Sequence, residues 1–222
     1  MELNDVMRTT FSARDYTGEP LPDEALHEIL ENARFAPSGG NRQGVRIIAV
    51  RDQGLRDRLR DLAEPAAKRY VAQIAAGESP WNARTPTCVT DDDIERAVAA
   101  PSLVKPFGTA SVVLVFVVDL GVVAATDQIL DRVGIIGGAS IYPLVWNVLL
   151  SARQLGFGGT ISTMAVAEEP RVQALLNIPS HYAVCAVVPL GRPVKQLTKL
   201  RRRAVVEFVT RERFDGEAFV FP

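Results

Sequence analysis

The sequence predicts one domain of the α+β class over residues 1–222, with a central mixed β-sheet flanked by helices. Two continuous apolar runs, residues 110–118 and 183–190, have the composition of strands that are buried on both faces. Two longer segments, residues 21–35 and 53–76, place apolar residues at helical spacing. Strands and helices do not alternate strictly along the chain, and this mixture favours α+β over a parallel βαβ fold.

The boundaries of these elements follow from prolines and from charge. The helix at residues 21–35 has Pro22 in its first turn and ends before Pro37, which cannot continue a helical hydrogen-bond ladder. A short β-type run follows at residues 45–51. Residues 133–152 carry no charge, and their glycines favour a helix buried in the core or in a dimer interface over a membrane span. The remaining predicted elements are a turn at residues 156–159 and a short helix at residues 168–176.

The composition is typical of a globular protein. Hydrophobic residues make up 47% of the chain, and 25 basic residues nearly balance 26 acidic ones, so the formal net charge is −1. Nucleic-acid phosphates are bound by an excess of basic residues, so we expect no nucleic-acid partner. Two cysteines, Cys88 and Cys185, cannot form a disulfide framework, and the first ten residues contain no apolar run. We therefore expect a cytoplasmic protein without a membrane partner.

The sequence lacks the familiar catalytic residue sets. Its two histidines, His27 and His181, lie near no cysteine or paired carboxylate at metal-ligand spacing, so we expect no metal site. No G-x-S-x-G nucleophile elbow and no P-loop is present. The glycine cluster at residues 156–159 follows a predicted helix rather than a strand, and Ile161 fills the third glycine position of a dinucleotide-binding turn. These features predict that a bound cofactor, rather than a catalytic side chain, carries the chemistry.

Three polar patches can together bind an anion and a ring. Residues 8–16 offer two guanidinium groups and several hydroxyls, and arginine matches the geometry of phosphate. In residues 36–43, two glycines permit left-handed backbone, so successive N–H groups can line a concave site. Residues 199–203 are a basic run. Each patch also has an ordinary interpretation: a solvated N-terminal turn, a helix stop with its turn, and a solvated surface segment.

In combination and in this order, the patches resemble the nitroreductase family of FMN-dependent oxidoreductases, over about residues 7–209. Residues 36–43 are similar to the family's A-P-S-x-x-N-x-Q motif after its first long helix. Residues 12–16 are similar to its S-x-R-x-F pattern, and residues 155–160 to its L-G-x-G segment beside the flavin ring. Residues 201–207 are similar to its C-terminal basic motif, which precedes a crossing tail.

This resemblance implies an intertwined homodimer that holds FMN at its interface with residues of both subunits. The residues expected at the ribityl phosphate are Arg8, Ser12, Arg14, Arg202 and Arg203. Those expected from the second subunit, along the dimethylbenzene side and the ribityl chain, are Pro37, Ser38, Gly39 and Asn41, with Gln43 in the same motif. Those expected near N5 or the pyrimidine edge of the isoalloxazine are Gly158, Gly159 and Thr160. Residues 204–222 form the tail that is expected to cross to the partner.

The implied reaction is a ping-pong cycle in which NAD(P)H gives hydride to flavin N5, departs, and is replaced by a nitroaromatic, quinone or related acceptor. Alternatives with the same fold are enone reduction, reductive dehalogenation, flavin cleavage and non-catalytic FMN binding or storage.

The sequence departs from the family at two places. Thr10-Phe11 stands where many members have an arginine, which shifts the expected phosphate contacts to Arg14 and the C-terminal arginines. Gly44-Val45 stands where the family often has Pro-Trp.

The Pro-rich segment at residues 77–108 is the expected acceptor lid, because long connections inside compact domains are usually functional. Trp81 and Phe107 are the candidates to cover a flat acceptor, since aromatic faces stack at small entropic cost. The alternative is that both residues anchor the segment to the core. Dehalogenating members use a lid with charged contacts to a zwitterionic substrate, and the nearest counterparts here, at a spacing that does not match, are Glu64, Lys68 and Tyr70.

Overall fold

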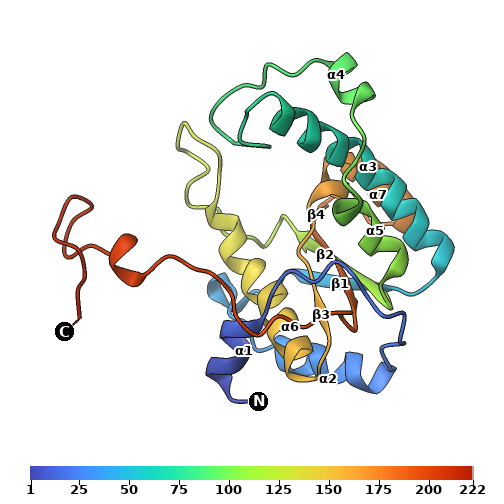
Figure 1. Ribbon diagram of the computed structural model, residues 1–222, viewed down its shortest axis with the longest axis horizontal. Helices are drawn as coiled ribbons and strands as arrows, with labels where there is room; N and C mark the ends of the chain where they lie inside the picture. Colours follow the sequence, from blue (N-terminus) through green and yellow to red (C-terminus); the bar gives the residue numbers. More distant parts are fainter. Residues whose placement is uncertain (222) are drawn as a thin grey trace.

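A four-stranded sheet forms the centre of the protein, in a computed structural model that describes residues 1–221. The strands lie in the order β1 (Val45–Val50), β2 (Val112–Asp119), β4 (Tyr182–Gly191) and β3 (Gly158–Gly159), as Figure 1 shows. The predicted α+β class is confirmed. The expected mixed sheet is corrected in one respect, because each of the three strand pairs in the described chain is antiparallel. An apolar run does not encode strand direction, since either pairing buries the same side chains.

Helices cover both faces of this sheet. α2 and α6 pack on one face, and α3, α5 and α7 pack on the other. Local sequence sets several ends: the Asp52 carboxylate accepts a hydrogen bond from the Leu55 N–H at 2.8 Å and caps α3. The helices in chain order are α1 (Leu3–Thr9), α2 (Asp23–Ala33), α3 (Gln53–Ala75), α4 (Asp91–Arg96), α5 (Pro101–Thr109), α6 (Tyr142–Gln154) and α7 (Glu169–Leu176). Short 3-10 helices are η1 (Gly39–Asn41), η2 (Ile136–Ser140), η3 (Met164–Glu168) and η4 (Val205–Glu207).

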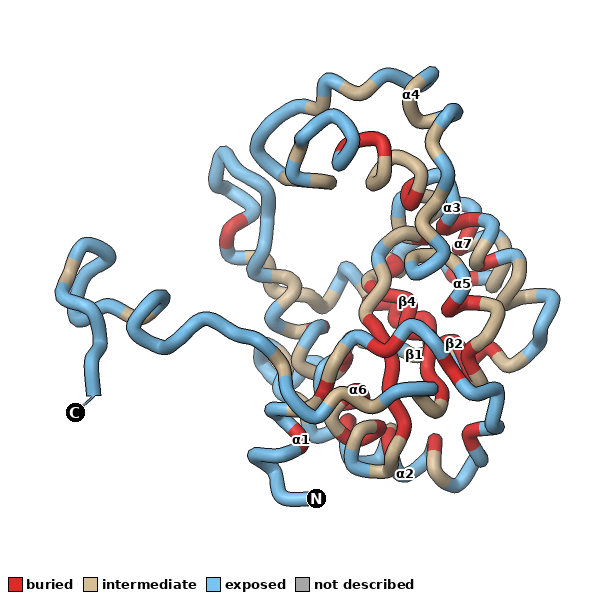
Figure 2. The backbone as a smooth tube through the Cα atoms, viewed as in Figure 1, coloured by how far each residue is buried: buried red, intermediate tan, exposed pale blue. Residues whose placement is uncertain are grey.

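Strand β2 lies in the middle of the sheet and is buried on both faces, as its apolar sequence predicted. Its alternate side chains enter two separate cores, because successive residues of a strand point to opposite faces. Leu114 and Phe116 enter the core formed with α2 and α6. Val113 and Val115 enter the core formed with α3, α5 and α7. Figure 2 shows that the buried residues are concentrated in the region of the central sheet.

The helix predicted at residues 133–152 is wrong in its first half. Helix α6 begins at Tyr142, and the residues before it form turns and the short helix η2. Glycines at positions 134, 137 and 138 weaken a helix there. Pro143 suits the first turn of α6, where its missing N–H has no helical partner to lose. Within residues 1–221, no helix combines the length and the apolar character that a membrane span needs.

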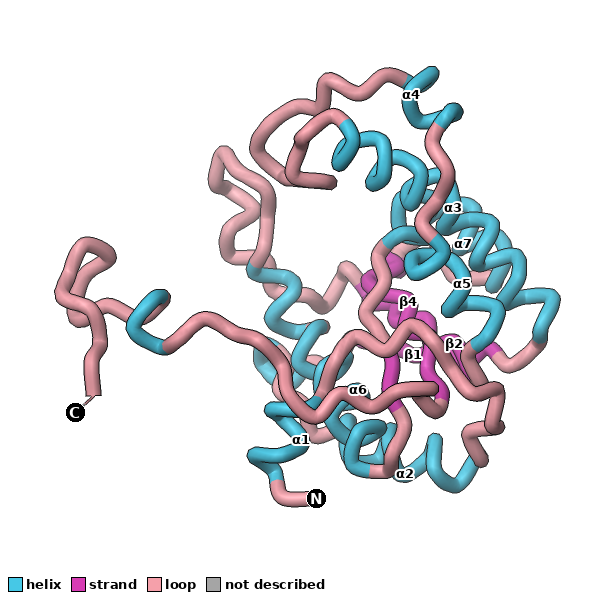
Figure 3. The backbone as a smooth tube through the Cα atoms, in the orientation of Figure 1, coloured by secondary structure: helices cyan, strands magenta, loops and turns pink. Residues whose placement is uncertain are grey.

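The segment expected to be a long lid, residues 77–108, is partly helical, because it contains α4 and most of α5. Thr90 begins α4 with a capping box: its hydroxyl accepts from the Asp93 N–H at 3.2 Å, and the Asp93 carboxylate accepts from the Thr90 N–H at 3.0 Å. The Thr90 hydroxyl also donates to the Asp93 carboxylate at 2.6 Å, and this bond, followed by those from the Thr90 N–H and from Arg96, lowers the pKa of Asp93 to about 2. The irregular part is residues 77–90, which we call the Trp81 loop (Figure 3).

Residues 192–221 form a C-terminal arm that leaves the body of the protein (Figure 1). Its first residues run beside the N-terminal segment, where the Val194 N–H donates to the carbonyl oxygen of Asp15 at 3.0 Å. Further along, Phe214 is 101% exposed and Phe221 is 85% exposed. Large apolar side chains in this position have no cover from the rest of the described protomer.

Candidate functional site

A narrow cleft, which we call the hydroxyl cleft, lies between α5 and the segment that follows β3. Its volume is about 150 Å³. Of the predicted site residues, Arg14 and Thr160 line it, and Phe107 borders it. The other lining residues are Tyr70, Ser102, Leu103, Pro106, Ile161, Ser162, Thr163, Met164 and Pro189. One wall therefore carries hydroxyl groups, and the α5 wall is largely apolar.

The N-terminal segment is pinned at the cleft by the residues that flank Arg14. The Ala13 N–H donates to the Gly159 carbonyl oxygen at 3.0 Å. The Tyr16 hydroxyl lies 2.8 Å from the carbonyl oxygen of Ala13 and 2.9 Å from that of Pro189, and it donates to them. Burial raises the pKa of Tyr16 well above its usual range, so this hydroxyl remains a neutral donor. The backbone on both sides of Arg14 is thereby fixed at the cleft, and the exposed Arg14 side chain, which lines the cleft, can bind an anion there.

The two predicted glycines of β3 lie behind the cleft and bring the chain against the sheet. A Cβ atom on Gly159 would lie 2.6 Å from the carbonyl oxygen of Pro189, and one on Gly158 would lie 3.0 Å from the side chain of Pro193. The approach to a backbone atom at Gly159 leaves no room for a side chain, whereas a side chain at Gly158 would require the Pro193 ring to shift. The next residue, Thr160, is 4% exposed and is the first of this segment to line the cleft.

A second cavity, which we call the apolar bay, adjoins the hydroxyl cleft. The two share three lining residues, Tyr70, Thr163 and Met164. The bay has a volume of about 410 Å³, and its other lining residues are Ala66, Pro80, Trp81, Val166 and Ala167. Trp81 lines this bay, and its contact with an acceptor stays a prediction. The side chains that line the bay carry no charge, so it suits an apolar molecule.

Phe107, a candidate to cover the acceptor, lies in the core of the protomer and reaches only the wall of the hydroxyl cleft. Its side chain is 0% exposed and belongs to the core that also contains Leu59 and Val115. The alternative interpretation, an aromatic anchor in the core, therefore holds for this residue. The loop expected through position 108 ends earlier, because α5 begins at Pro101 and turns Phe107 inward.

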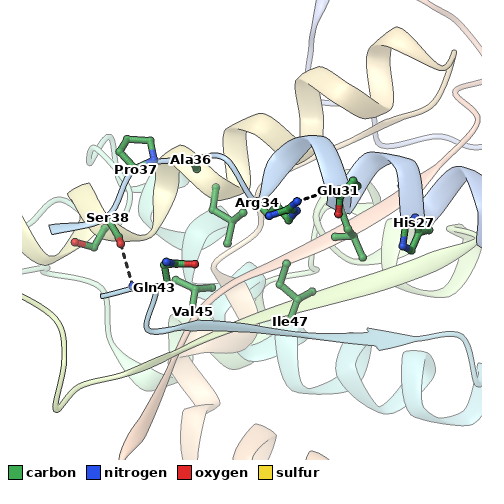
Figure 4. A pocket seen from close by; sticks show the side chains of 12 residues that line it. His27, Glu31, Arg34, Ala36, Pro37, Ser38, Gln43, Val45 and Ile47 are labelled. Atoms are coloured by element: carbon green, nitrogen blue, oxygen red, sulfur yellow. Dashed lines mark hydrogen bonds and ion pairs between the residues drawn. The ribbon is translucent and has the colours of Figure 1, made fainter. Parts of the chain in front are cut away.

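The predicted segment Pro37–Gln43 lines a different cavity, the α2–β1 pocket, which has a volume of about 410 Å³. Figure 4 shows α2 on one side of this pocket and β1 on the other. Pro37, Ser38 and Gln43 line it, and Gly39 is tied to its wall because the Gly39 N–H donates to the Ser140 hydroxyl at 3.0 Å. The remaining lining residues are His27, Leu30, Glu31, Arg34, Ala36, Val45, Ile47, Ser140 and Leu144.

The Pro37–Gln43 segment has the left-handed backbone that its glycines suggested. Gly40 has a φ of +60°, and the two non-glycine residues Asn41 and Gln43 have φ values of 54° and 49°. The Ser38 hydroxyl accepts from the Gln43 N–H at 3.0 Å, and the Gln43 amide donates to the Asn41 side-chain oxygen at 3.1 Å. Non-glycine residues persist in this conformation when the surrounding contacts impose it, which is common at binding sites.

The remaining predicted phosphate ligands are exposed and dispersed. Arg8 lies in the last turn of α1, and the carbonyl oxygen of Ser12 accepts from Arg14 at 3.4 Å. Arg202 and Arg203 lie on the C-terminal arm. A single protomer therefore does not bring these four residues into the wall of the cleft that Arg14 lines.

Most residues that line the hydroxyl cleft and the apolar bay were not among the predicted site residues. One usable signal was a run of hydroxyl residues, Thr160, Ser162 and Thr163, directly after the glycine cluster. Tyr70 had been noted only as a mismatched counterpart of a charged lid. No group of three or more His, Cys, Asp and Glu side chains in the described chain is placed to hold a metal ion. The cavities offer hydrogen-bond donors, a guanidinium and apolar surface, which together can position an organic ring and its phosphate.

Comparison with known proteins identifies the family of the chain. The nitroreductase family model matches residues 7–192. The chain is 31% identical over 188 residues to an NADH dehydrogenase of Thermus thermophilus, which covers 83% of each chain. It is 26% identical over 211 residues to an FMN reductase (NAD(P)H) of Bacillus subtilis, covering 90% of this chain and 70% of that one.

A solved structure of iodotyrosine deiodinase bound to FMN and 3-iodo-L-tyrosine shares the fold. Its TM-score is 0.68 at 21% identity, and the match covers 96% of this chain and 100% of that one. The family model spans most of the chain, and the Thermus relative exceeds 30% identity over a similar length. This chain belongs to the nitroreductase family.

Proposed function

We propose that the protein is an FMN-dependent NAD(P)H oxidoreductase that reduces flat organic acceptors, such as quinones and nitroaromatics, in a ping-pong cycle. The observation that carries this proposal is the junction of the hydroxyl cleft with the apolar bay, through the shared residues Tyr70, Thr163 and Met164. A polar-walled site for a cofactor then adjoins an apolar site for its reaction partner. The relatives named NADH dehydrogenase and FMN reductase support the same chemistry.

The side chains of the hydroxyl cleft suit the ring edge and the phosphate of FMN, and the volume of about 150 Å³ has room for only part of the cofactor. The isoalloxazine is flat, largely apolar on its faces, and edged by carbonyl oxygens and ring nitrogens. Thr160 and Thr163 offer hydroxyls for that edge, and Leu103 offers apolar contact for a ring face. Arg14 offers a guanidinium for the ribityl phosphate, and charge-assisted bonds of this kind are the strong ones.

We further propose that two copies complete the site. The Pro37–Gln43 segment lines its own pocket, and Arg202 and Arg203 lie on an arm directed away from the body. Both groups can reach a flavin if the partner's site receives them. The exposed phenylalanines of the arm support this arrangement, because large apolar side chains of this kind are usually covered in an assembly. Residues 204–222 would then cross to the partner subunit.

When bound, FMN would supply the two-electron redox chemistry that links NAD(P)H to the acceptor. The chain's own task is to hold and orient the reactants. Arg14 and the hydroxyl wall would anchor the cofactor, while Trp81 and Met164 would seat the acceptor and keep water from its ring.

The first test is an absorbance spectrum of the purified protein, recorded before and after anaerobic addition of NADH or NADPH. We expect flavin bands that bleach with the nucleotide and return when menadione is added. Bands that persist after both nucleotides would instead favour a flavin carrier. A protein that shows no flavin, even after incubation with FMN, would contradict the proposal. Size-exclusion chromatography with light scattering tests the dimer, which we expect at all micromolar concentrations.

A further inference from the structure

A buried glutamine ties the Trp81 loop to helix α3. Gln73 is 2% exposed, and its side-chain oxygen Oε1 accepts from the backbone N–H of Trp81 at 3.1 Å. Its amide donates to the Glu78 carboxylate at 3.1 Å. One side chain therefore holds two points of the loop. Buried amides are retained where their hydrogen bonds are made, so this contact specifies the position of the loop.

Glu78 closes the loop on itself. Its carboxylate accepts from the Thr87 hydroxyl at 2.7 Å and from the Cys88 N–H at 2.7 Å. Hydrogen bonding from the Cys88 thiol, then from the Thr87 hydroxyl and then from the Cys88 N–H lowers the pKa of Glu78 to about 2. The ionised carboxylate thus joins the beginning of the Trp81 loop to its end.

The indole of Trp81 is held by a second contact from α3. The guanidinium carbon of Arg69 lies 4.5 Å from the centroid of the Trp81 ring, and the indole N–H donates to the carbonyl oxygen of Ala66 at 3.4 Å. Trp81 adopts a φ of 54°, which a bulky residue does only when its surroundings impose it. The ring is still 42% exposed and lines the apolar bay, so it presents a prepared surface to a ligand.

The residues that line the bay include no charged side chain that could pair with a charged ligand. Its polar side-chain groups are the hydroxyls of Tyr70 and Thr163 and the indole N–H of Trp81, which already donates to the Ala66 carbonyl oxygen. Glu64 and Lys68, the candidate contacts for a zwitterion, pair with each other at 3.8 Å on α3 and do not line the bay. An ammonium or carboxylate placed against these apolar walls would lose its hydration without gaining a partner.

We propose that Gln73 and Arg69 are positioning residues that hold Trp81 as one wall of an acceptor site selective for uncharged flat rings over zwitterionic ones. This inference rests on the proposed function and specifies its substrate class. Trp81 contacts the acceptor, whereas Gln73 and Arg69 act through Trp81.

The decisive pair of acceptors is 4-nitrotoluene and 4-nitro-L-phenylalanine, which share the ring and nitro group and differ by the charged amino-acid group. We expect kcat/KM for 4-nitrotoluene to exceed that for 4-nitro-L-phenylalanine at least about tenfold, because charges are desolvated without partners. Trp81→Ala should raise KM for 4-nitrotoluene about tenfold with kcat within about twofold, as lost stacking and apolar contact require. Equal kcat/KM values for the two compounds would overturn the inference.

The positioning role is tested by Gln73→Leu and Arg69→Met, with Ile74→Ala as the matched control. Ile74 follows Gln73 on α3 and is 53% exposed, so its truncation should change neither KM nor the fluorescence. Both positioning variants should raise KM for 4-nitrotoluene and shift the emission of Trp81 to the red, because the indole moves into water. A Gln73→Leu protein with unchanged KM and unchanged emission would refute the assignment.

Binding can be followed without turnover. In the oxidised protein, 4-nitrotoluene should quench tryptophan emission, and Trp81→Phe should remove that quenching although Trp146 remains. Quenching that survives Trp81→Phe would place the ligand elsewhere and overturn the inference. Failure of NAD(P)H to bleach the flavin would refute the proposed function alone, since the quenching still decides whether the bay binds a neutral ring. Bleaching combined with equal use of the two nitro compounds would refute only the selectivity.

Discussion

Phe107→Ala distinguishes a core residue from an acceptor lid. The Phe107 side chain is 0% exposed and packs in the core between the sheet and helices α3 and α5. Truncating a buried phenylalanine to alanine costs about 3–5 kcal/mol of unfolding free energy, because apolar contacts are lost and a cavity remains. In a protein of this size, each kcal/mol corresponds to roughly 2–4 °C, so the melting temperature should fall by about 6–20 °C.

The assay is thermal unfolding followed by far-ultraviolet circular dichroism, with FMN held in constant excess. Phe214→Ala is the matched control, because Phe214 is 101% exposed in the protomer and its truncation removes no buried contact there. We expect the dimer to dissociate more readily in that variant while the protomer core stays intact. A Phe107→Ala protein that keeps its melting temperature and only raises the KM of the acceptor would refute the placement of Phe107 in the core.

Three further predictions concern the cofactor cleft, the Trp81 loop and strand β3. Arg14→Ala should weaken FMN binding about 10- to 100-fold, because a charge-assisted hydrogen bond is lost. Flavin fluorescence titration measures the change, and Arg84→Ala, at an exposed position of the Trp81 loop, is the control. The pKa of Glu78 is lowered from 4.5 to about 2, so its hydrogen bonds stabilise the loop above pH 4.5 and are lost as the pH falls toward 2. The emission of Trp81 should therefore shift to the red over that interval, and Glu78→Gln should show no shift there. Gly159→Ala should lower stability and FMN retention together, because its Cβ would lie 2.6 Å from a carbonyl oxygen of β4; in Gly134→Ala, where the nearest atom is 3.8 Å away, both should stay within experimental error.

The sheet and its main helices could be predicted because their signals are local. Strand β2 is an unbroken apolar run, and burial on both faces demands that composition. Pro22 and Pro37 mark the start and the stop of the α2 region, since proline is accepted in a first turn and not in a helix interior. By contrast, the uncharged stretch before Tyr142 has the composition of a buried helix, but its glycines favour turns. The predicted burial of this stretch is therefore wrong at Ile135, which is 67% exposed.

The site was predicted only as far as contiguous motifs reach. Arg14 and Thr160 lie in short patterns with a recognisable purpose, and the structure puts both at one cleft. The apolar bay is made by α3, the Trp81 loop and η3, so Tyr70 and Met164 meet only after the chain has folded. The burial of Phe107 was not predicted for a similar reason: the local sequence of an aromatic residue near prolines does not distinguish a loop from a buried helix face.

The central position of β2 has a consequence for synthesis of the chain. Its two neighbours in the sheet, β1 and β4, come from opposite ends of the sequence, and β4 ends at Gly191. While the polypeptide is still emerging from the ribosome, one edge of this apolar strand stays open until nearly the whole chain has been made. Open apolar edges pair readily with other chains, and long-range strand pairing is slow. We therefore expect nascent chains truncated before β4 to need a chaperone.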